Sequence, residues 1–171
     1  QLGVSAEEMD YADGRAFVAA DPEKGMTRAE FTVTLLTAAG IAPEGEAECS
    51  FADKNDITAS ALPYVAMAQK LGLTSGWIID GEQMFMPNAE ITLAEAAHMT
   101  ALLLGLNSDR AVEVSVGSAN FARYELDALC STGLAGAFLE VSPSESLSRA
   151  DAAEIFCGVL MLARAGGIPN E

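Results

Sequence analysis

Apolar stretches with the length of single helices alternate with polar, turn-rich segments along the chain. Pro63 falls in the first turn of one such stretch, where its missing N–H is tolerated. Each stretch closes on a glycine, a residue that commonly terminates helices. The pattern therefore predicts a mainly α-helical protein with five helices, within residues 27–40, 61–72, 92–105, 119–133 and 148–166.

The segments between the predicted helices differ in character. The connector at residues 73–87 contains Gly76 and the pair Asp80-Gly81, which predicts turns around one short extended segment. The linker at residues 107–118 is polar and is expected to be a surface loop, with residues 111–116 as a weak strand candidate.

A nine-residue phrase occurs three times: PEKGMTRAE at 22–30, PNAEITLAE at 87–95 and PSESLSRAD at 143–151. Each copy reads Pro, three mostly polar residues, an apolar residue, Thr or Ser, any residue, Ala, and an acid. This recurrence indicates duplication, and the long spacing indicates modules rather than a short solenoid repeat. We therefore divide the chain into modules at 1–47, 48–108 and 109–171.

The first module is expected to be incomplete. Its opening residues 1–5, QLGVS, resemble residues 70–74, KLGLT, which end the leading helix of the second module. By this match the chain begins where the leading helix of the first module ends. We expect the domain either to lack that helix or to obtain it from upstream sequence or from another chain.

Most of the phrase has a role in starting a helix. With Thr27 as N-cap, Glu30 stands at N3, and the two predict a capping box. The same offsets pair Thr92 with Glu95, and Ser148 with Asp151. A helix cap contributes about 0.5–2 kcal/mol, so folding alone can explain these positions.

The residue after the N-cap is not explained by helix initiation. Arg28 and Arg149 occupy this N1 position, where the helix dipole disfavours a cation, and Leu93 stands there in the second copy. An arginine beside helix-start amides suits the binding of a carboxylate or phosphate. The alternative is a surface arginine that pairs with a neighbouring acid.

Composition and charge exclude several classes of function. Nine basic and 25 acidic residues give a net charge of −16, which argues against a nucleic-acid partner. No apolar run is long enough to span a membrane. A single histidine, His98, leaves little basis for a Ser–His triad, and no carboxylate pair or metal-type spacing stands out. We expect neither an enzyme nor a bound metal or cofactor.

The three cysteines, Cys49, Cys130 and Cys157, are an odd number without metal-type spacing. They are compatible with one disulfide bond. Buried free thiols are the simpler interpretation.

Several of these motifs together resemble S-layer homology modules. They are TRAE at 27–30, the Gly, Asp-Gly and Phe-x-Pro pattern of the connector at 76–87, and Phe-Ala-Asp at 51–53. The resemblance covers two full modules and most of a third. It implies helix–loop–helix modules that form one pseudo-threefold body with grooves between them. It also implies a non-catalytic, secreted domain that attaches bacterial proteins, mainly Gram-positive ones, to secondary cell-wall polysaccharides that often carry pyruvate ketals.

The resemblance also assigns roles to particular residues. It makes Arg28 and Arg149 contacts for the ligand's carboxylate, while Thr27, Glu30, Ser148 and Asp151 shape the same helix starts. Trp77 stands in the connector, where it suits either stacking on a sugar ring or packing between modules. Because Leu93 replaces the arginine of the second copy, at most two sites are expected to be competent. Two functions stay open: glycan anchoring, or a degenerate module with a structural or protein-interaction role.

Overall fold

The computed structural model of the chain describes residues 22–43, 48–106, 126, 128–129, 132 and 142–166. Within them are four α-helices: α1 (Arg28–Ala38), α2 (Leu62–Lys70), α3 (Leu93–Leu103) and α5 (Arg149–Arg164). They also include a 3₁₀ turn, η1 (Lys54–Asp56), and the strands β1 (Trp77–Ile79) and β2 (Glu82–Met84). Three predictions lie outside the described residues: the helix end at residues 1–5, the strand candidate at 111–116 and most of the helix at 119–133.

The four described helices begin and end as the sequence predicts. Residues Thr27, Thr92 and Ser148 are the N-caps of α1, α3 and α5, and Pro63 lies in the first turn of α2. Just beyond the helices, four glycines adopt the positive φ that favours this residue at a helix end. They are Gly40, Gly72, Gly105 and Gly166.

The connector contains two strands, whereas the sequence predicted one extended segment. Strands β1 and β2 pair antiparallel, with Trp77 opposite Met84 and Ile79 opposite Glu82. Asp80 and Gly81 join them with φ values of 52° and 86°. Positive φ at both central residues is typical of the two-residue hairpin turn, which an Asp-Gly pair favours.

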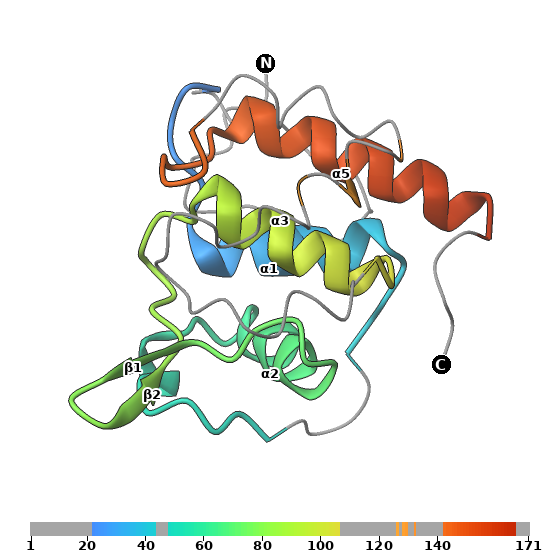
Figure 1. Ribbon diagram of the computed structural model, residues 1–171. Coiled ribbons are helices and arrows are strands. Elements are labelled where there is room, and N and C mark those ends of the chain that lie inside the picture. Colours follow the sequence, from blue (N-terminus) through green and yellow to red (C-terminus); the bar gives the residue numbers. More distant parts are fainter. Residues whose placement is uncertain are drawn as a thin grey trace, which may run out of the picture.

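Helices α1, α3 and α5 lie side by side and run in the same direction, so that their N-terminal ends gather at one end of the molecule (Figure 1). Their facing sides form the main core, which also contains Leu73 and Met67. In this core Phe31 of α1 contacts Phe156 of α5, with ring centroids 5.2 Å apart. The bundle therefore brings the starts of all three phrase helices close together.

Helix α2 and the β1–β2 hairpin form a second layer beside α1 (Figure 1). A smaller core joins this layer to the bundle through Val33, Phe51, Val65 and Phe85. Among the described residues, no helix has the length and apolar character needed to cross a bilayer.

Candidate binding site where the three phrases meet

The three phrases are joined by a closed ring of backbone hydrogen bonds. The fifth residue of each copy takes part: Met26, Ile91 and Leu147. The Ile91 amide donates to the Met26 carbonyl, the Leu147 amide to the Ile91 carbonyl, and the Met26 amide to the Leu147 carbonyl, each over 2.9 Å. Isolated β-bridges repeat the same order, pairing the sixth residue of each copy with the fourth residue of the next. The phrases are thus related cyclically.

The ring also supplies partners for the first amides of each helix. The amides of Arg28 and Ala29 donate to the carbonyls of Ala89 and Pro87, over 2.9 and 3.1 Å. In α3 and α5 the N1 amide likewise donates to the carbonyl of the third residue of the next phrase, and the N2 amide donates to the carbonyl of its first residue. Helix-start amides have no partner within their own helix, so the neighbouring phrase satisfies them.

The N3 amides are bonded to the N-cap hydroxyls, as in Glu30 N to Thr27 Oγ1 at 3.2 Å. All of the first three amides in α1, α3 and α5 therefore have protein partners. The expectation that free helix-start amides assist an arginine in binding an anion is wrong, because the cyclic contact with the next phrase occupies them.

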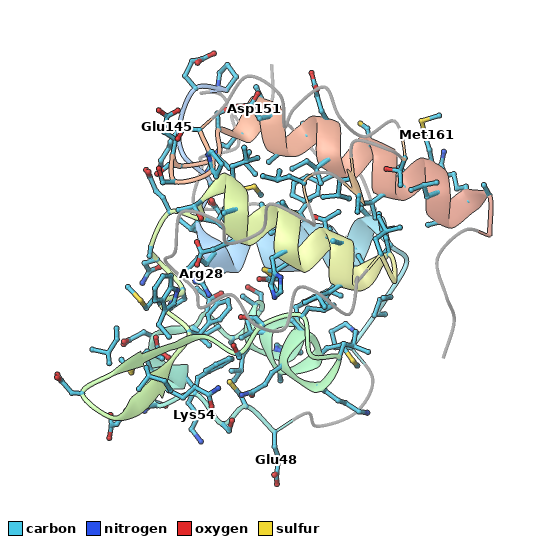
Figure 2. The ribbon with its side chains drawn as sticks, viewed as in Figure 1. Arg28, Glu48, Lys54, Glu145, Asp151 and Met161 are labelled. Carbon is cyan, nitrogen blue, oxygen red and sulfur yellow. The ribbon has the colours of Figure 1, made fainter. Side chains whose placement is uncertain are left out.

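Arg28 lies at the junction between the first and second phrases, and 6% of its side chain is exposed. Its Nε donates to the Phe85 carbonyl over 2.7 Å, and its Nη1 forms an ion pair with Glu95 Oε1. The guanidinium carbon also lies 5.3 Å from the centre of the Phe85 ring, within the range of a cation–π contact. Figure 2 shows Arg28 between the bundle and the second layer.

Glu95 serves both its own helix and its neighbour. Its Oε2 accepts from the amide and hydroxyl of Thr92 over 3.0 and 3.1 Å, which completes the capping box of α3. Its Oε1 accepts hydrogen bonds from Arg28 Nη1 and, over 3.0 Å, from the indole N–H of Trp77. The carboxylate is only 11% exposed. One partly buried acid therefore connects a helix cap, an arginine and the hairpin.

Arg149 lies at the junction between the third and first phrases and is similarly buried, at 7%. Its Nη2 donates to Glu30 Oε1 over 2.6 Å, while Glu30 Oε2 accepts from the Thr27 amide over 3.0 Å. The Glu30 side chain is 23% exposed. The Nε of Arg149 is buried, yet it has no hydrogen-bond partner among the described residues.

The third junction, between the second and third phrases, differs from the other two. Leu93 takes the arginine's place and is fully buried. In the other two junctions the N1 arginine pairs with the N3 acid of the next phrase, so Leu93 stands where a partner of Asp151 would be. Asp151 Oδ2 instead accepts from the Ser148 hydroxyl over 2.6 Å. The complete capping box predicted here is wrong: Ser148 caps the Asp151 amide, but only α1 and α3 have the reciprocal bond. Aspartate is one methylene shorter than glutamate, which reduces its reach toward the N-cap amide.

The ring explains why arginine is tolerated at N1. A cation at a helix start is disfavoured by the dipole, but in the first and third phrases the acid of the next phrase compensates it. The structure therefore corrects the picture of a surface arginine paired with an acid. Both arginines are buried, and both acids come from another phrase.

Asp53 fixes the end of the connector to the start of the 48–108 segment. Its Oδ1 and Oδ2 accept from the amides of Phe85 and Met86 over 2.8 and 2.7 Å. Phe85 also packs on Phe51, with ring centroids 5.4 Å apart. These contacts hold the carbonyl that receives Arg28, and they give a physical role to the Phe-Ala-Asp motif.

These contacts lie in or beside a segment that matches a known protein family. Residues 50–97 match the S-layer homology domain. Domains of this family generally anchor proteins to cell-wall polymers. No curated protein matches the chain.

The S-layer homology match includes the second phrase and its connector, while the first and third phrases lie outside it. The ring brings the predicted site residues of the phrases to one end of the bundle, where Figure 2 labels Arg28 and Asp151, and the bond from Trp77 to Glu95 attaches the hairpin there. The predicted residues are Arg28, Arg149, Thr27, Glu30, Ser148, Asp151 and Trp77.

Sequence reasoning did not assign Glu95, Asp53 or the Phe85 carbonyl to this site. The sequence predicts only a capping role for Glu95, because its second partner, Arg28, lies 67 residues away. The signal available in the sequence was the Phe-Ala-Asp motif together with the recurrence of an N1 arginine and an N3 acid.

The described cysteines are free thiols. Cys49 is half-buried and Cys157 is exposed, so the expectation of buried thiols is wrong for Cys157. That residue faces outward on α5 because the buried side of the helix is formed by Ala152, Ile155, Phe156 and Val159. Cys130 lies outside the described residues.

Proposed function

We propose that this chain is a non-catalytic, secreted anchoring domain. It binds an anionic secondary cell-wall polysaccharide, of the kind that carries pyruvate ketals, in grooves between S-layer homology modules on a bacterial, Gram-positive cell surface. The observation that carries the proposal is the match at 50–97, whose phrase is joined cyclically to two further copies. Modules with boundaries at 1–47, 48–108 and 109–171 are part of the proposal.

The proposed chemistry is a charge-assisted hydrogen bond between guanidinium and a ligand carboxylate. Each guanidinium has five N–H donors, and the described contacts of Arg28 and Arg149 use two and one of them. Because the chain carries a net charge of −16, affinity for an anionic polymer has to come from local contacts. Two such contacts in one body give avidity on a repeating polymer even where each is weak.

Trp77 is proposed as a stacking surface for a sugar ring. Its half-buried indole is oriented by the bond to Glu95, which places it beside the Arg28 ion pair. Thr27, Glu30, Ser148 and Asp151 support the site through the helix starts.

Sedimentation with purified cell walls tests this function. The wild type is expected to pellet with walls from a Gram-positive bacterium that carry pyruvylated polymer, and to stay in the supernatant with walls stripped of that polymer by acid. The double variant Arg28→Ala/Arg149→Ala is expected to lose pelleting. The matched control is Arg164→Ala, which removes an exposed arginine in the last turn of α5 and is expected to pellet normally.

Circular dichroism has to show that the double variant is folded, because both arginines are buried in ion pairs. A wild type that does not pellet would overturn the anchoring function. In that case the runner-up is favoured: a degenerate module whose arginines serve only to hold the phrases together.

A further inference from the structure

We infer that the two N1 arginines have different roles: Arg149 is the principal ligand contact, and Arg28 is a fixed link between the first two phrases. This inference rests on the proposed anchoring function. It replaces the expectation of two equivalent ligand sites by that of two sites with unequal affinity. The difference follows from what each guanidinium already contacts.

Arg28 is engaged on several sides. Its Nε bonds to the Phe85 carbonyl, its Nη1 bonds to Glu95, and its guanidinium contacts the Phe85 ring. Phe85 is itself immobilised, since it is fully buried and its amide donates to Asp53. A ligand oxygen at the Nε of Arg28 would have to displace a carbonyl that cannot move away easily.

The acid beside Arg28 is equally committed. Glu95 accepts four hydrogen bonds, two on each oxygen, from Arg28, Trp77 and the two donors of Thr92. A ligand carboxylate that replaced Glu95 at Arg28 would leave the indole N–H and the capping box to be satisfied again. Buried groups that lose their partners cost free energy, which weakens binding at this junction.

Arg149 has the opposite arrangement. The one described hydrogen bond of its side chain is from Nη2 to Glu30, an acid about twice as exposed as Glu95. Its Nε is buried without a partner in the part of the chain that the structure describes. Nε and Nη2 lie on the same edge of a guanidinium, which is the edge that grips a carboxylate with two bonds. A ligand oxygen at Nε satisfies a donor and displaces none of the described groups.

Matched single substitutions distinguish the two roles. Arg28→Met and Arg149→Met each replace an arginine by the same unbranched apolar side chain at the same position of two phrases. We expect Arg149→Met to lower apparent affinity for polymer-bearing walls about 10- to 100-fold, the value of a hydrogen bond to a charged group. We expect Arg28→Met to stay within about threefold of the wild type in wall affinity where it is folded, and to lower the melting temperature more than Arg149→Met does.

A second measurement follows ligand binding in the wild-type chain itself. In the ¹⁵N-labelled full chain, the arginine Nε–H signals are followed by NMR as sodium pyruvate is added as a carboxylate probe. The Arg149 signal, assigned by its loss in Arg149→Lys, is expected to shift and saturate, whereas the Arg28 signal stays in place.

The inference is overturned if the Arg28 signal shifts and that of Arg149 does not, if neither shifts, or if folded Arg28→Met loses wall binding while Arg149→Met retains it. These results differ from failure of the anchoring function itself. In that case the wild type does not pellet, whatever the arginine signals show.

Discussion

Replacing the N3 acid of each phrase by alanine gives three matched perturbations in one protein. Glu95→Ala removes the described carboxylate partner of Arg28 together with the reciprocal half of the capping box of α3. Glu30→Ala removes the partner of Arg149 and the reciprocal half of the capping box of α1. Asp151→Ala removes the bond from the Ser148 hydroxyl and no described ion pair.

The structure predicts unequal losses of stability. Removing one partner of a buried ion pair costs about 3–5 kcal/mol, and loss of the N3 side-chain bond to the N-cap amide costs about 0.5–1.5 kcal/mol. Because both side chains of the Arg28–Glu95 pair are at least 89% buried, we expect Glu95→Ala to cost about 4–6 kcal/mol in all. Glu30 is 23% exposed, so water partly replaces it, and Glu30→Ala is expected to cost about 2–4 kcal/mol. For Asp151→Ala, loss of the bond from the Ser148 hydroxyl alone predicts about 0.5–1.5 kcal/mol.

Urea unfolding followed by far-UV circular dichroism measures these differences, and the loss at Glu95 corresponds to a fall in melting temperature of roughly 10–20 °C. A double-mutant cycle then tests the pair itself. Arg28→Met combined with Glu95→Ala should cost about 1–3 kcal/mol less than the sum of the single losses. Equal losses at all three acids, or strict additivity in the cycle, would refute the cyclic pairing as a source of stability.

Two further predictions concern the connector and the third junction. Gly76→Ala should destabilise the protein by about 1–3 kcal/mol more than Gly81→Ala: both glycines have positive φ, but a Cβ at Gly76 would collide with the Met84 carbonyl, whereas one at Gly81 meets open space. Equal urea midpoints would show that this close approach is not tight. Leu93→Arg should cost about 3–5 kcal/mol by burying an unpaired charge, and adding Asp151→Glu should restore at least about 1 kcal/mol. Pairing at that junction would be contradicted if Asp151→Glu raised the free energy of unfolding no more in the Leu93→Arg variant than in the wild type.

The local parts of this fold were predictable because their causes lie within a few residues. Thr27, Thr92 and Ser148 start helices through bonds to residues three positions later, and the glycines after the helices supply positive φ. The second strand of the connector was missed because three-residue strands carry little periodic signal. The hairpin was nevertheless implied by Asp80-Gly81.

The contacts of the arginines could not be predicted in the same way. Arg149 and Glu30 are 119 residues apart in sequence, and they meet only because the ring joins the third phrase to the first. The first and third copies of the phrase each contain both an arginine and an acid, which suggests a pair within one helix start. The structure instead pairs the N1 residue of one copy with the N3 acid of the next.

This cyclic rule gives a new meaning to the two departures from the repeated phrase. In the sequence they look independent, since Leu93 lies in the second copy and Asp151 in the third. Under the rule they belong to the same junction, because the N1 residue of the second copy corresponds to a partner of the N3 acid of the third. A leucine there removes the requirement for a long acid that reaches both its own cap and a neighbour's guanidinium, and a shorter aspartate then suffices. The ring therefore contains two ionic junctions and one apolar junction, and the change at the third is a matched pair rather than two separate losses.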